Sequence, residues 1–246
     1  GLLEALGARL LDDAGRPVGD GGAALTRVAS IDLTALRERM DGVEVIVACD
    51  VDNPLTGPLG AAAVYGPQKG ADPAQVAELD AALGQWAGRL AAELGSDRRA
   101  AAGAGAAGGV GFAALAVLGA TLRPGIELML ELVGFDERLA GVDLVITGEG
   151  KLDEQTLHGK APAGVAAAAR AAGVPVVAVC GRNTLPPERS RAAGFAAVYS
   201  LIEIEPDEQR CLSAGLMLLQ QLGVRVADDY LPAVAATVSE QSGGEA

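Results

Sequence analysis

The sequence predicts an α/β protein with a parallel sheet, and three observations support this fold class. Runs rich in β-branched residues alternate with helical patterns from residue 141 onward, as in βαβ crossover units. Half of the 246 residues are hydrophobic, which is ample for a packed core, and only 3% are aromatic, which suits close helix-on-sheet packing. In order, we expect a strand at 142–147, a helix at 162–172, strands at 174–180 and 195–201, and a helix at 207–222.

The first half of the chain carries four further patterns. Leucines at helical spacing predict an amphipathic helix over residues 1–12, and the β-branched run at 43–49 predicts a short buried strand. Apolar residues recur every three or four positions over 73–94, which predicts a helix with Trp86 on its buried face. Further helices are expected at 110–118 and 126–133, separated by the Pro124-Gly125 break.

The net charge of −13 restricts the partners of the chain. Sequence-independent binding to nucleic acid, or to an anionic membrane surface, needs clustered Lys and Arg, so we expect neither partner. The uncharged stretch Ala100–Leu122 is long enough to cross a bilayer, but its many glycines and alanines favour a buried loop and helix. An anionic ligand would need locally placed cations, and all three lysines lie in glycine-punctuated polar segments: Lys69, Lys151 and Lys160.

The cysteines and the single histidine exclude the common metal frameworks. Cys49, Cys180 and Cys211 have no metal-type spacing, and we interpret them as small buried residues of a protein in the reducing cytoplasm. One histidine cannot build a His-cluster zinc site. The chain begins at Gly1 without Met, which is consistent with a processed or truncated product.

The first segment that could carry chemistry runs from Asp50 to Gly70. Asp50 and Asp52 directly follow a predicted strand, where carboxylates can hold Mg²⁺ or accept a proton from an attacking hydroxyl. Asn53 follows them, and Lys69 stands next to a glycine, where it could reach a phosphate or carboxylate. Two tight turns are the alternative, but the density of Asp, Asn, Lys and Gly favours a functional segment.

The second such segment, residues 147–160, follows a predicted strand and precedes a helix. In open α/β sheets this crevice binds ligands, with glycine amides and the helix N-terminus facing an anion. An ordinary solvated loop is the alternative, and a structural hydrogen bond explains the histidine as well as a functional role does. The candidate residues are Thr147, Gly148, Glu149, Gly150, Lys151, Asp153, His158 and Lys160.

Two common motifs do not fit. The run Gly103-Ala-Gly105-Ala-Ala-Gly108 has dinucleotide spacing, but it follows a charged helical stretch where the motif needs a strand, which disfavours an NAD-dependent enzyme. A Walker A loop would need a glycine where Glu154 stands. The glycine run could instead open the helix at residue 110.

Taken together, these segments closely resemble the class I glycerate kinase family. The resemblance rests on Ala48–Gly70, Gly103–Phe112, Pro124–Glu127, Asp143–Gly150 and His158–Pro162, which occur in the order of that family. It covers residues 1 to about 235. It implies phosphorylation of D-glycerate to 2-phosphoglycerate with ATP and Mg²⁺. It also implies a flavodoxin-like parallel-sheet domain, here represented by 141–246, into which a second α/β domain, mainly 1–140, is inserted.

For this chemistry we expect Asp50 and Asp52 to share the metal and base roles, with Asp153 as a second candidate base. The three lysines would bind phosphate or the glycerate carboxylate. The substrate and ATP set is completed by Asn53, Thr147, Gly148, Glu149, Gly150 and His158. We expect the turns after 43–49 and 142–147 to face each other across one pocket.

The chain departs from the family in one large respect. The Asp-Ser-Phe-Lys-Gly and Gly-Gly-Ser-Ala-Thr-Asn-Asp-Gly-Gly segments of the family's N-terminal portion are absent, so the chain resembles a fragment that lacks strands of the sheet and part of the cleft. A non-catalytic anion- or nucleotide-binding domain, or an inactive kinase fragment, is therefore the alternative. A homodimer is compatible with the sequence.

Overall fold

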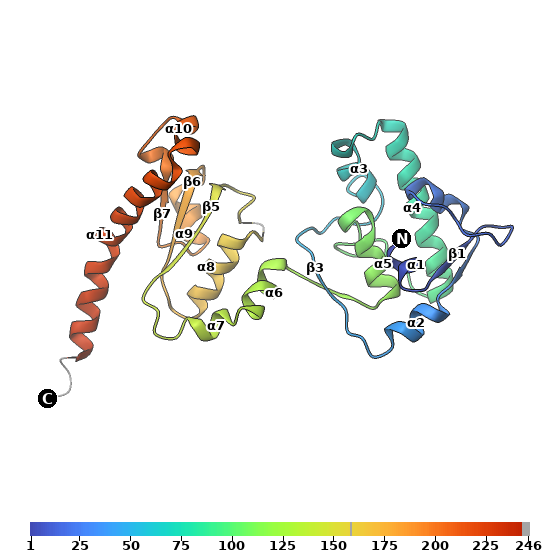
Figure 1. The fold of residues 1–246 in the computed structure, drawn as a ribbon, viewed down its shortest axis with the longest axis horizontal. Coiled ribbons are helices and arrows are strands. Elements are labelled where there is room, and N and C mark those ends of the chain that lie inside the picture. Colours follow the sequence, from blue (N-terminus) through green and yellow to red (C-terminus); the bar gives the residue numbers. More distant parts are fainter. Residues whose placement is uncertain (158, 243–246) are drawn as a thin grey trace. The chain divides into compact units, whose positions relative to one another are not determined.

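The chain forms two compact units in a computed structural model that describes residues 1–157 and 159–242, excluding the side chains of 231–242 (Figure 1). Unit 1 is Gly1–Gly125 and unit 2 is Ile126–Ala246, so the division falls ahead of the expected boundary at residue 140. Both units combine helices with parallel strands, which confirms the α/β class. The assignment of the two parts to an inserted and a flavodoxin-like domain stays a prediction.

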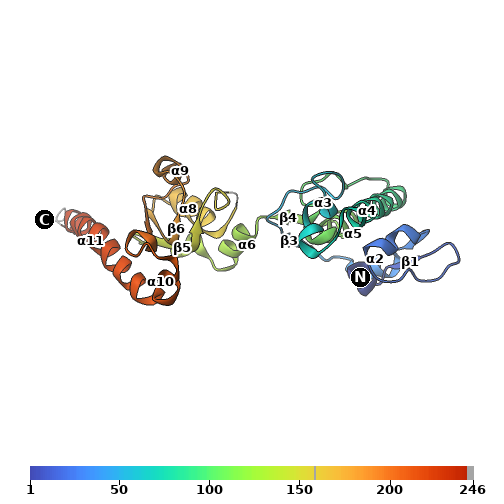
Figure 2. The same cartoon turned by 90° about the horizontal axis from the view of Figure 1, so that it is seen from above.

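Unit 1 contains two two-stranded sheets. Strand β1 (Arg9–Leu11) pairs antiparallel with β2 (Ser30–Asp32), and β3 (Ile46–Ala48) pairs parallel with β4 (Thr121–Arg123), as Figure 2 shows for the second pair. The helices are α1 (Leu2–Ala5), α2 (Thr34–Met40), α3 (Ala61–Tyr65), α4 (Pro73–Leu94) and α5 (Val110–Val117), with short 3-10 helices at Gly22–Arg27, Pro67–Lys69 and Ala106–Gly108.

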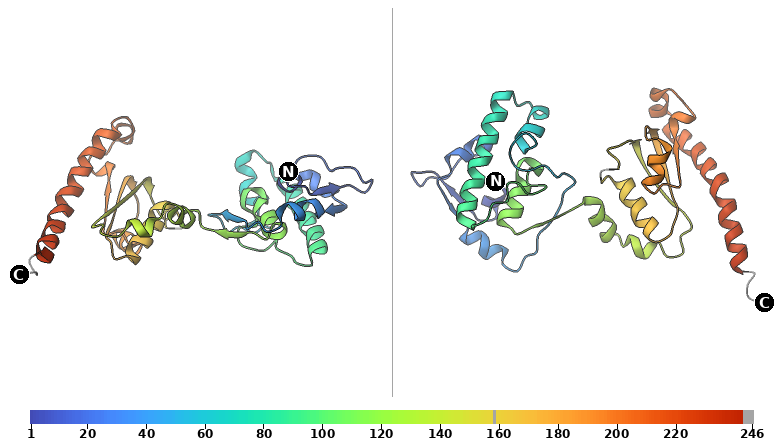
Figure 3. Two further views of the ribbon diagram at one scale, coloured as in Figure 1. Left: turned by 60° about the horizontal axis from the view of Figure 1, so that its bottom comes forward. Right: turned by 180° about the vertical axis from the view of Figure 1, so that it is seen from behind.

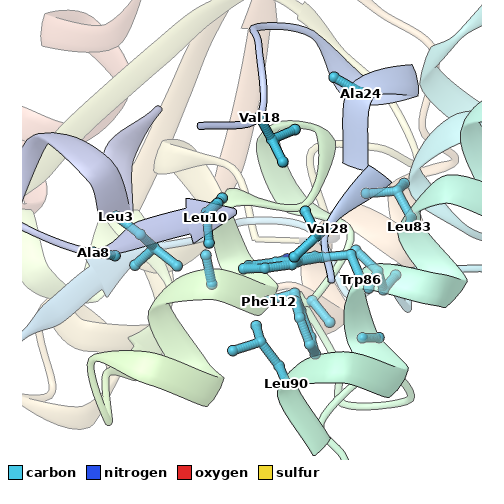
Figure 4. Packing of buried hydrophobic residues seen from close by; sticks show 14 of the residues in the cluster. Leu3, Ala8, Leu10, Val18, Ala24, Val28, Leu83, Trp86, Leu90 and Phe112 are labelled. Carbon is cyan, nitrogen blue, oxygen red and sulfur yellow. The ribbon is translucent and has the colours of Figure 1, made fainter. Parts of the chain in front are cut away.

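Helix α4 organises the core of unit 1 and has the predicted bounds. Asp72 caps its N-terminus in a reciprocal pair with Gln75, and Gly95 ends it in the left-handed conformation at φ 70°. Trp86 is only 5% exposed, as predicted, and lies beside Phe112 of α5 and Val28 in Figure 4. Caps at both ends and one buried stripe thus fix this helix.

The predicted helix over residues 1–12 is wrong. Helix α1 ends early because Gly7 turns the backbone to φ 113°, where a Cβ would lie 3.2 Å from the backbone of Ala35. The chain then enters β1. Leu3 and Leu10 are both buried in one core, but from a helix and a strand. The expected strand at 43–49 forms only as β3, and it is not buried, since Ile46 is 44% exposed. Strand β4 was not predicted.

Unit 2 is built on a parallel sheet with strand order β5–β6–β7, which confirms the predicted alternation. The strands are β5 (Val145–Leu152), β6 (Val176–Asn183) and β7 (Ala197–Ser200). The helices are α6 (Gly125–Leu132), α7 (Phe135–Arg138), α8 (Ala161–Ala171), α9 (Pro187–Ala192), α10 (Glu208–Ser213) and α11 (Gly215–Ser242), with a 3-10 helix at Leu201–Glu203. Helix α8 packs against β5 and β6, and Figure 3 shows α11 extending past the sheet.

Two boundaries in unit 2 differ from the prediction. Strand β5 begins later than expected and continues to Leu152, so residues 147–151 lie on a strand and not in a loop. Gly148 allows this, because a Cβ there would come within 2.3 Å of the Val179 carbonyl oxygen on β6. The expected helix at 207–222 is two helices, because the backbone at Ala214 (φ −113°, ψ 19°) leaves the helical region.

Two of the three cysteines match the expectation of small buried residues, and Cys49 does not. Cys180 and Cys211 are buried, Cys49 is partly exposed, and none of the three forms a disulfide. In the part of the chain that the structure describes, no helix combines the length and the apolar character needed to cross a bilayer.

Candidate functional site

In unit 1, the loop after β3 is held by the side chain of Asn53. Its Nδ2 donates to the Leu59 carbonyl at 2.9 Å, and its Oδ1 accepts from the Tyr65 hydroxyl at 2.6 Å. The Asn53 backbone carbonyl accepts from the amide of Gly105 at 2.8 Å. These contacts give Asn53 a structural role in the loop.

The glycine run packs directly against this loop. A Cβ on Gly105 would lie 2.4 Å from the carbonyl oxygen of Pro54, and one on Gly103 would lie 3.2 Å from Cys49 Sγ. The element directly before the run is helix α4 and not a strand, which agrees with the rejection of a dinucleotide motif. Helix α5 begins just after the run, at Val110. The glycines thus serve close backbone packing.

The charged residues of the loop divide into bound and unbound groups. Asp50 Oδ1 accepts from the amide of Gly125, the last residue of unit 1, at 2.7 Å. Asp52 and Lys69 are exposed, and the side chain of neither forms a hydrogen bond or ion pair with another described residue. Lys69 lines a small, largely apolar pocket of about 140 Å³ together with Tyr65. The loop therefore offers one carboxylate and one ammonium group that the fold of unit 1 does not use.

In unit 2, the end of β5 and the start of α8 bring four charged side chains together. Lys151 Nζ lies 3.0 Å from Asp153 Oδ2, and Lys160 Nζ lies 3.9 Å from both Glu149 Oε2 and Asp153 Oδ1. The carboxylate side chains are 17% and 19% exposed, and the ammonium side chains are 56% and 43% exposed. We call these four residues the β5–α8 cluster. Its cations are its outermost groups, so an incoming anion meets them first.

The surroundings of Asp153 keep it ionised. A hydrogen bond from Lys151 holds the pKa of this carboxyl below its ordinary value, and the Gln155 amide and the charge of Lys160 act in the same direction. Desolvation opposes them without reversing the shift. At neutral pH the cluster therefore contains an anionic Asp153 beside two cations.

The cluster depends on a residue that the sequence did not indicate, Thr156. Its side chain is fully buried, its hydroxyl donates to Glu149 Oε1, and it accepts from the Asp153 amide at 3.0 Å. The Thr156 hydroxyl therefore fixes both acidic positions of the cluster. The pattern gave no sign of this burial, because a threonine that follows Glu154 and Gln155 is typical of a solvated position.

The remaining predicted residues of this segment lie around the cluster. Thr147 and Gly148 are on β5. Lys160 is the N-cap of α8, and Pro162 occupies its first turn, where a missing N–H costs little. His158 lies outside the described residues.

A pocket of about 380 Å³ opens at the carboxyl ends of β5 and β6, where ligands of parallel sheets usually bind. Lys151 pairs in register with Arg182, and both line it. The other lining residues are Gly150, Gly181, Ile202, Glu208, Cys211 and Leu212.

Comparison with known proteins identifies the family of the chain. The sequence model of the Glycerate kinase family matches residues 1–231. This chain belongs to the glycerate kinase family.

Individual relatives point to the same family. The chain is 47% identical over 202 residues to the glycerate kinase of Bacillus subtilis (strain 168), covering 82% of this chain and 53% of that protein. It is 42% identical over 202 residues to the glycerate 2-kinase of Escherichia coli (strain K12), with the same two coverages. A crystal structure of "putative glycerate kinase 2" from Salmonella typhimurium LT2 is 46% identical, with a TM-score of 0.71 over 81% of this chain and 52% of that one. The chain thus spans about half the length of these glycerate kinase relatives.

In this member of the glycerate kinase family, Asp50 and Asp52 are the predicted ligands of Mg²⁺. Within residues 1–157 and 159–242, no three His, Cys, Asp or Glu side chains gather as a metal site. A Mg²⁺ ion carried by a nucleotide usually needs only one or two protein carboxylates. The exposed Asp52 carboxylate fits that requirement, and Asp50 also has a second oxygen beyond its bond to Gly125. The roles of both residues stay predictions.

Proposed function

We propose that this chain carries residues for the ATP-dependent phosphorylation of D-glycerate to 2-phosphoglycerate. Its family supports a kinase, and a relative named glycerate 2-kinase supports the choice of hydroxyl. The observation that carries the proposal is the β5–α8 cluster, in which two cations lie outermost beside a pocket at the carboxyl edge of a parallel sheet. We expect it to act in the cytoplasm, and a homodimer stays a prediction.

The cations of the cluster have the chemistry that phosphoryl transfer requires. The transition state spreads negative charge over the phosphoryl oxygens, so catalysis depends on positioned positive charge. Lys151 and Lys160 are held by Asp153 and Glu149, which fixes their positions and leaves their outer sides open to phosphate or the glycerate carboxylate. Lys69 of unit 1, exposed and without an ion-pair partner among the described residues, would supply a third cation.

The carboxylates supply the remaining roles. A bound Mg²⁺ would neutralise charge on the nucleotide phosphates, and Asp52 with Asp50 would hold it. The proton of the attacking hydroxyl needs an ionised acceptor. The candidates are Asp50, Asp52 and Asp153, and the low pKa of Asp153 keeps it in the accepting form.

A non-catalytic anion- or nucleotide-binding role, or an inactive kinase fragment, is the second candidate. The observation that favours it is the length of the chain, which spans 53% of the Bacillus subtilis glycerate kinase and 60% of the one from Halalkalibacterium halodurans. The second candidate uses the same lysines and the same pocket as the kinase, and it differs from the kinase because it has no turnover.

A coupled assay of ADP release separates the two candidates. The chain is mixed with Mg-ATP with and without D-glycerate, and ³¹P NMR identifies the phosphorylated product. We expect steady ADP release that requires D-glycerate, and a 2-phosphoglycerate signal. Nucleotide binding without glycerate-dependent release would favour the second candidate, and a 3-phosphoglycerate signal would refute the choice of hydroxyl.

A further inference from the structure

The pocket at the ends of β5 and β6 has two chemically different walls. Lys151 and Arg182, on neighbouring strands, form a cationic wall. Ile202, Cys211 and Leu212 form an apolar wall. The volume of about 380 Å³ lies within the range of small-molecule sites. A ligand that fills this pocket therefore needs an anionic part and an apolar part.

We propose that this pocket binds ATP, with the adenine ring on the apolar wall and the phosphates toward Lys151 and Arg182. The inference rests on the proposed kinase function, which requires a nucleotide and a small hydroxy acid. Leu212 is 82% exposed, and glycerate has no apolar group large enough to cover it. A planar base would remove part of that apolar surface from water. The apolar wall thus favours the nucleotide over glycerate as its occupant.

Glu208 weakens the affinity of the cationic wall for anions. It lines the same pocket and forms an ion pair with Arg182, with side chains 64% and 51% exposed. Exposed pairs of this kind contribute little to stability, so a phosphate group can replace the carboxylate on the guanidinium at small cost. Glu208 therefore competes with the nucleotide for Arg182.

The two walls can be tested separately by calorimetric titration of the intact chain with ATP, adenosine and tripolyphosphate. Leu212→Gln should weaken the binding of ATP and adenosine by about tenfold, because an apolar contact is lost, and should leave the binding of tripolyphosphate unchanged, because no charge is added. Arg182→Gln should weaken ATP and tripolyphosphate by about tenfold and leave adenosine unchanged. Glu208→Gln should strengthen ATP binding by about threefold.

Arg189→Gln is the matched control. Arg189 is 52% exposed against 51% for Arg182, it also pairs with a glutamate (Glu154), and it does not line this pocket. Its substitution should change none of the three affinities. Because Leu212 and Arg182 are exposed, both variants should unfold at the wild-type temperature, and Leu212→Ser serves if the glutamine variant does not.

The outcomes also distinguish this inference from the proposed function. An ATP affinity that neither Leu212→Gln nor Arg182→Gln changes would overturn the inference, even in an active kinase, and so would the absence of ATP binding. Equal affinities of ATP and tripolyphosphate would overturn the adenine assignment. A chain that binds ATP as described but releases no ADP with glycerate would refute the kinase and leave the nucleotide pocket standing.

Discussion

The loop of unit 1 and the β5–α8 cluster of unit 2 use their polar residues differently. In the loop, side chains bind backbone groups: Asn53 binds Leu59, and Asp50 binds Gly125. In the cluster, charged side chains bind one another, as Lys151 and Asp153 do. The loop therefore keeps two charged groups, Asp52 and Lys69, apart from folding. In the cluster the same contacts fold the segment and arrange the charges, so substitutions should separate folding from chemistry in the loop but not in the cluster.

The largest expected effect tests the packing of the unit 1 loop. Gly105→Ala would place a Cβ 2.4 Å from the Pro54 carbonyl oxygen and should destabilise unit 1 by about 3 kcal/mol. Trp86, the only tryptophan and buried in this unit, reports the unfolding by its fluorescence. Gly84→Ala within α4 is the control, because its Cβ meets its nearest atom only at 4.0 Å, and it should stabilise slightly. Equal effects of the two substitutions would refute backbone packing as the cause.

The next effect tests the hydroxyl that links the acidic positions of the cluster. Thr156→Val removes both of its hydrogen bonds, leaves buried polar groups unpaired, and should cost about 2 kcal/mol in unit 2. It should also lower turnover, whereas Thr156→Ser should restore both. Circular dichroism follows both units and Trp86 fluorescence follows unit 1, so a transition that shifts in circular dichroism but not in fluorescence reports unit 2. A valine variant with normal turnover would show that Thr156 is structural only.

A smaller effect concerns acid stability. The pKa of Asp153 is lowered in the folded chain, so its contribution is fully present above the ordinary aspartate pKa and is lost as the pH falls through the folded value. We expect Asp153→Asn to flatten the decline in unit 2 stability below about pH 4. The measurement is urea unfolding from pH 6 to pH 2. An identical slope in both proteins would contradict the ion-paired state of Asp153.

The smallest expected effect on stability is that of Lys69→Gln. The side chain is exposed, with no ion pair to another described residue, so the free energy of unfolding should change by less than about 0.5 kcal/mol. Turnover should nevertheless fall by about tenfold or more if Lys69 binds an anionic substrate. Unchanged turnover would remove Lys69 from the proposed site.

The sequence predicted the fold best where local signals agree. Helix α4 has an N-cap at Asp72, a glycine at position 95 and one apolar stripe, so its bounds needed no tertiary information. The first residues misled because Leu3 and Leu10 keep helical spacing, and the strand partner of β1 lies twenty residues further along, at Ser30–Asp32. Pairing with a distant segment overrides local periodicity.

For the site, charge and glycine content located the segments but not their geometry. Gly148 was interpreted as part of a loop, and it is a strand residue that permits close contact with Val179. Thr156 was missed because it is buried only when its segment folds back to bring its hydroxyl to Glu149. Composition does not reveal that contact. Arg182 was missed because register with Lys151, and not sequence proximity, brings the two together.

The most direct test of the account is D-glycerate-dependent ADP release by two variants, one in each unit. Asp52→Asn and Glu149→Gln should each lower kcat by about a hundredfold or more, because Asp52 is proposed to hold the metal and Glu149 to hold Lys160. Asp52→Asn should leave unfolding unchanged. Turnover within a few-fold of wild type in either variant would contradict the role proposed for that carboxylate, as would a wild-type chain without glycerate-dependent release.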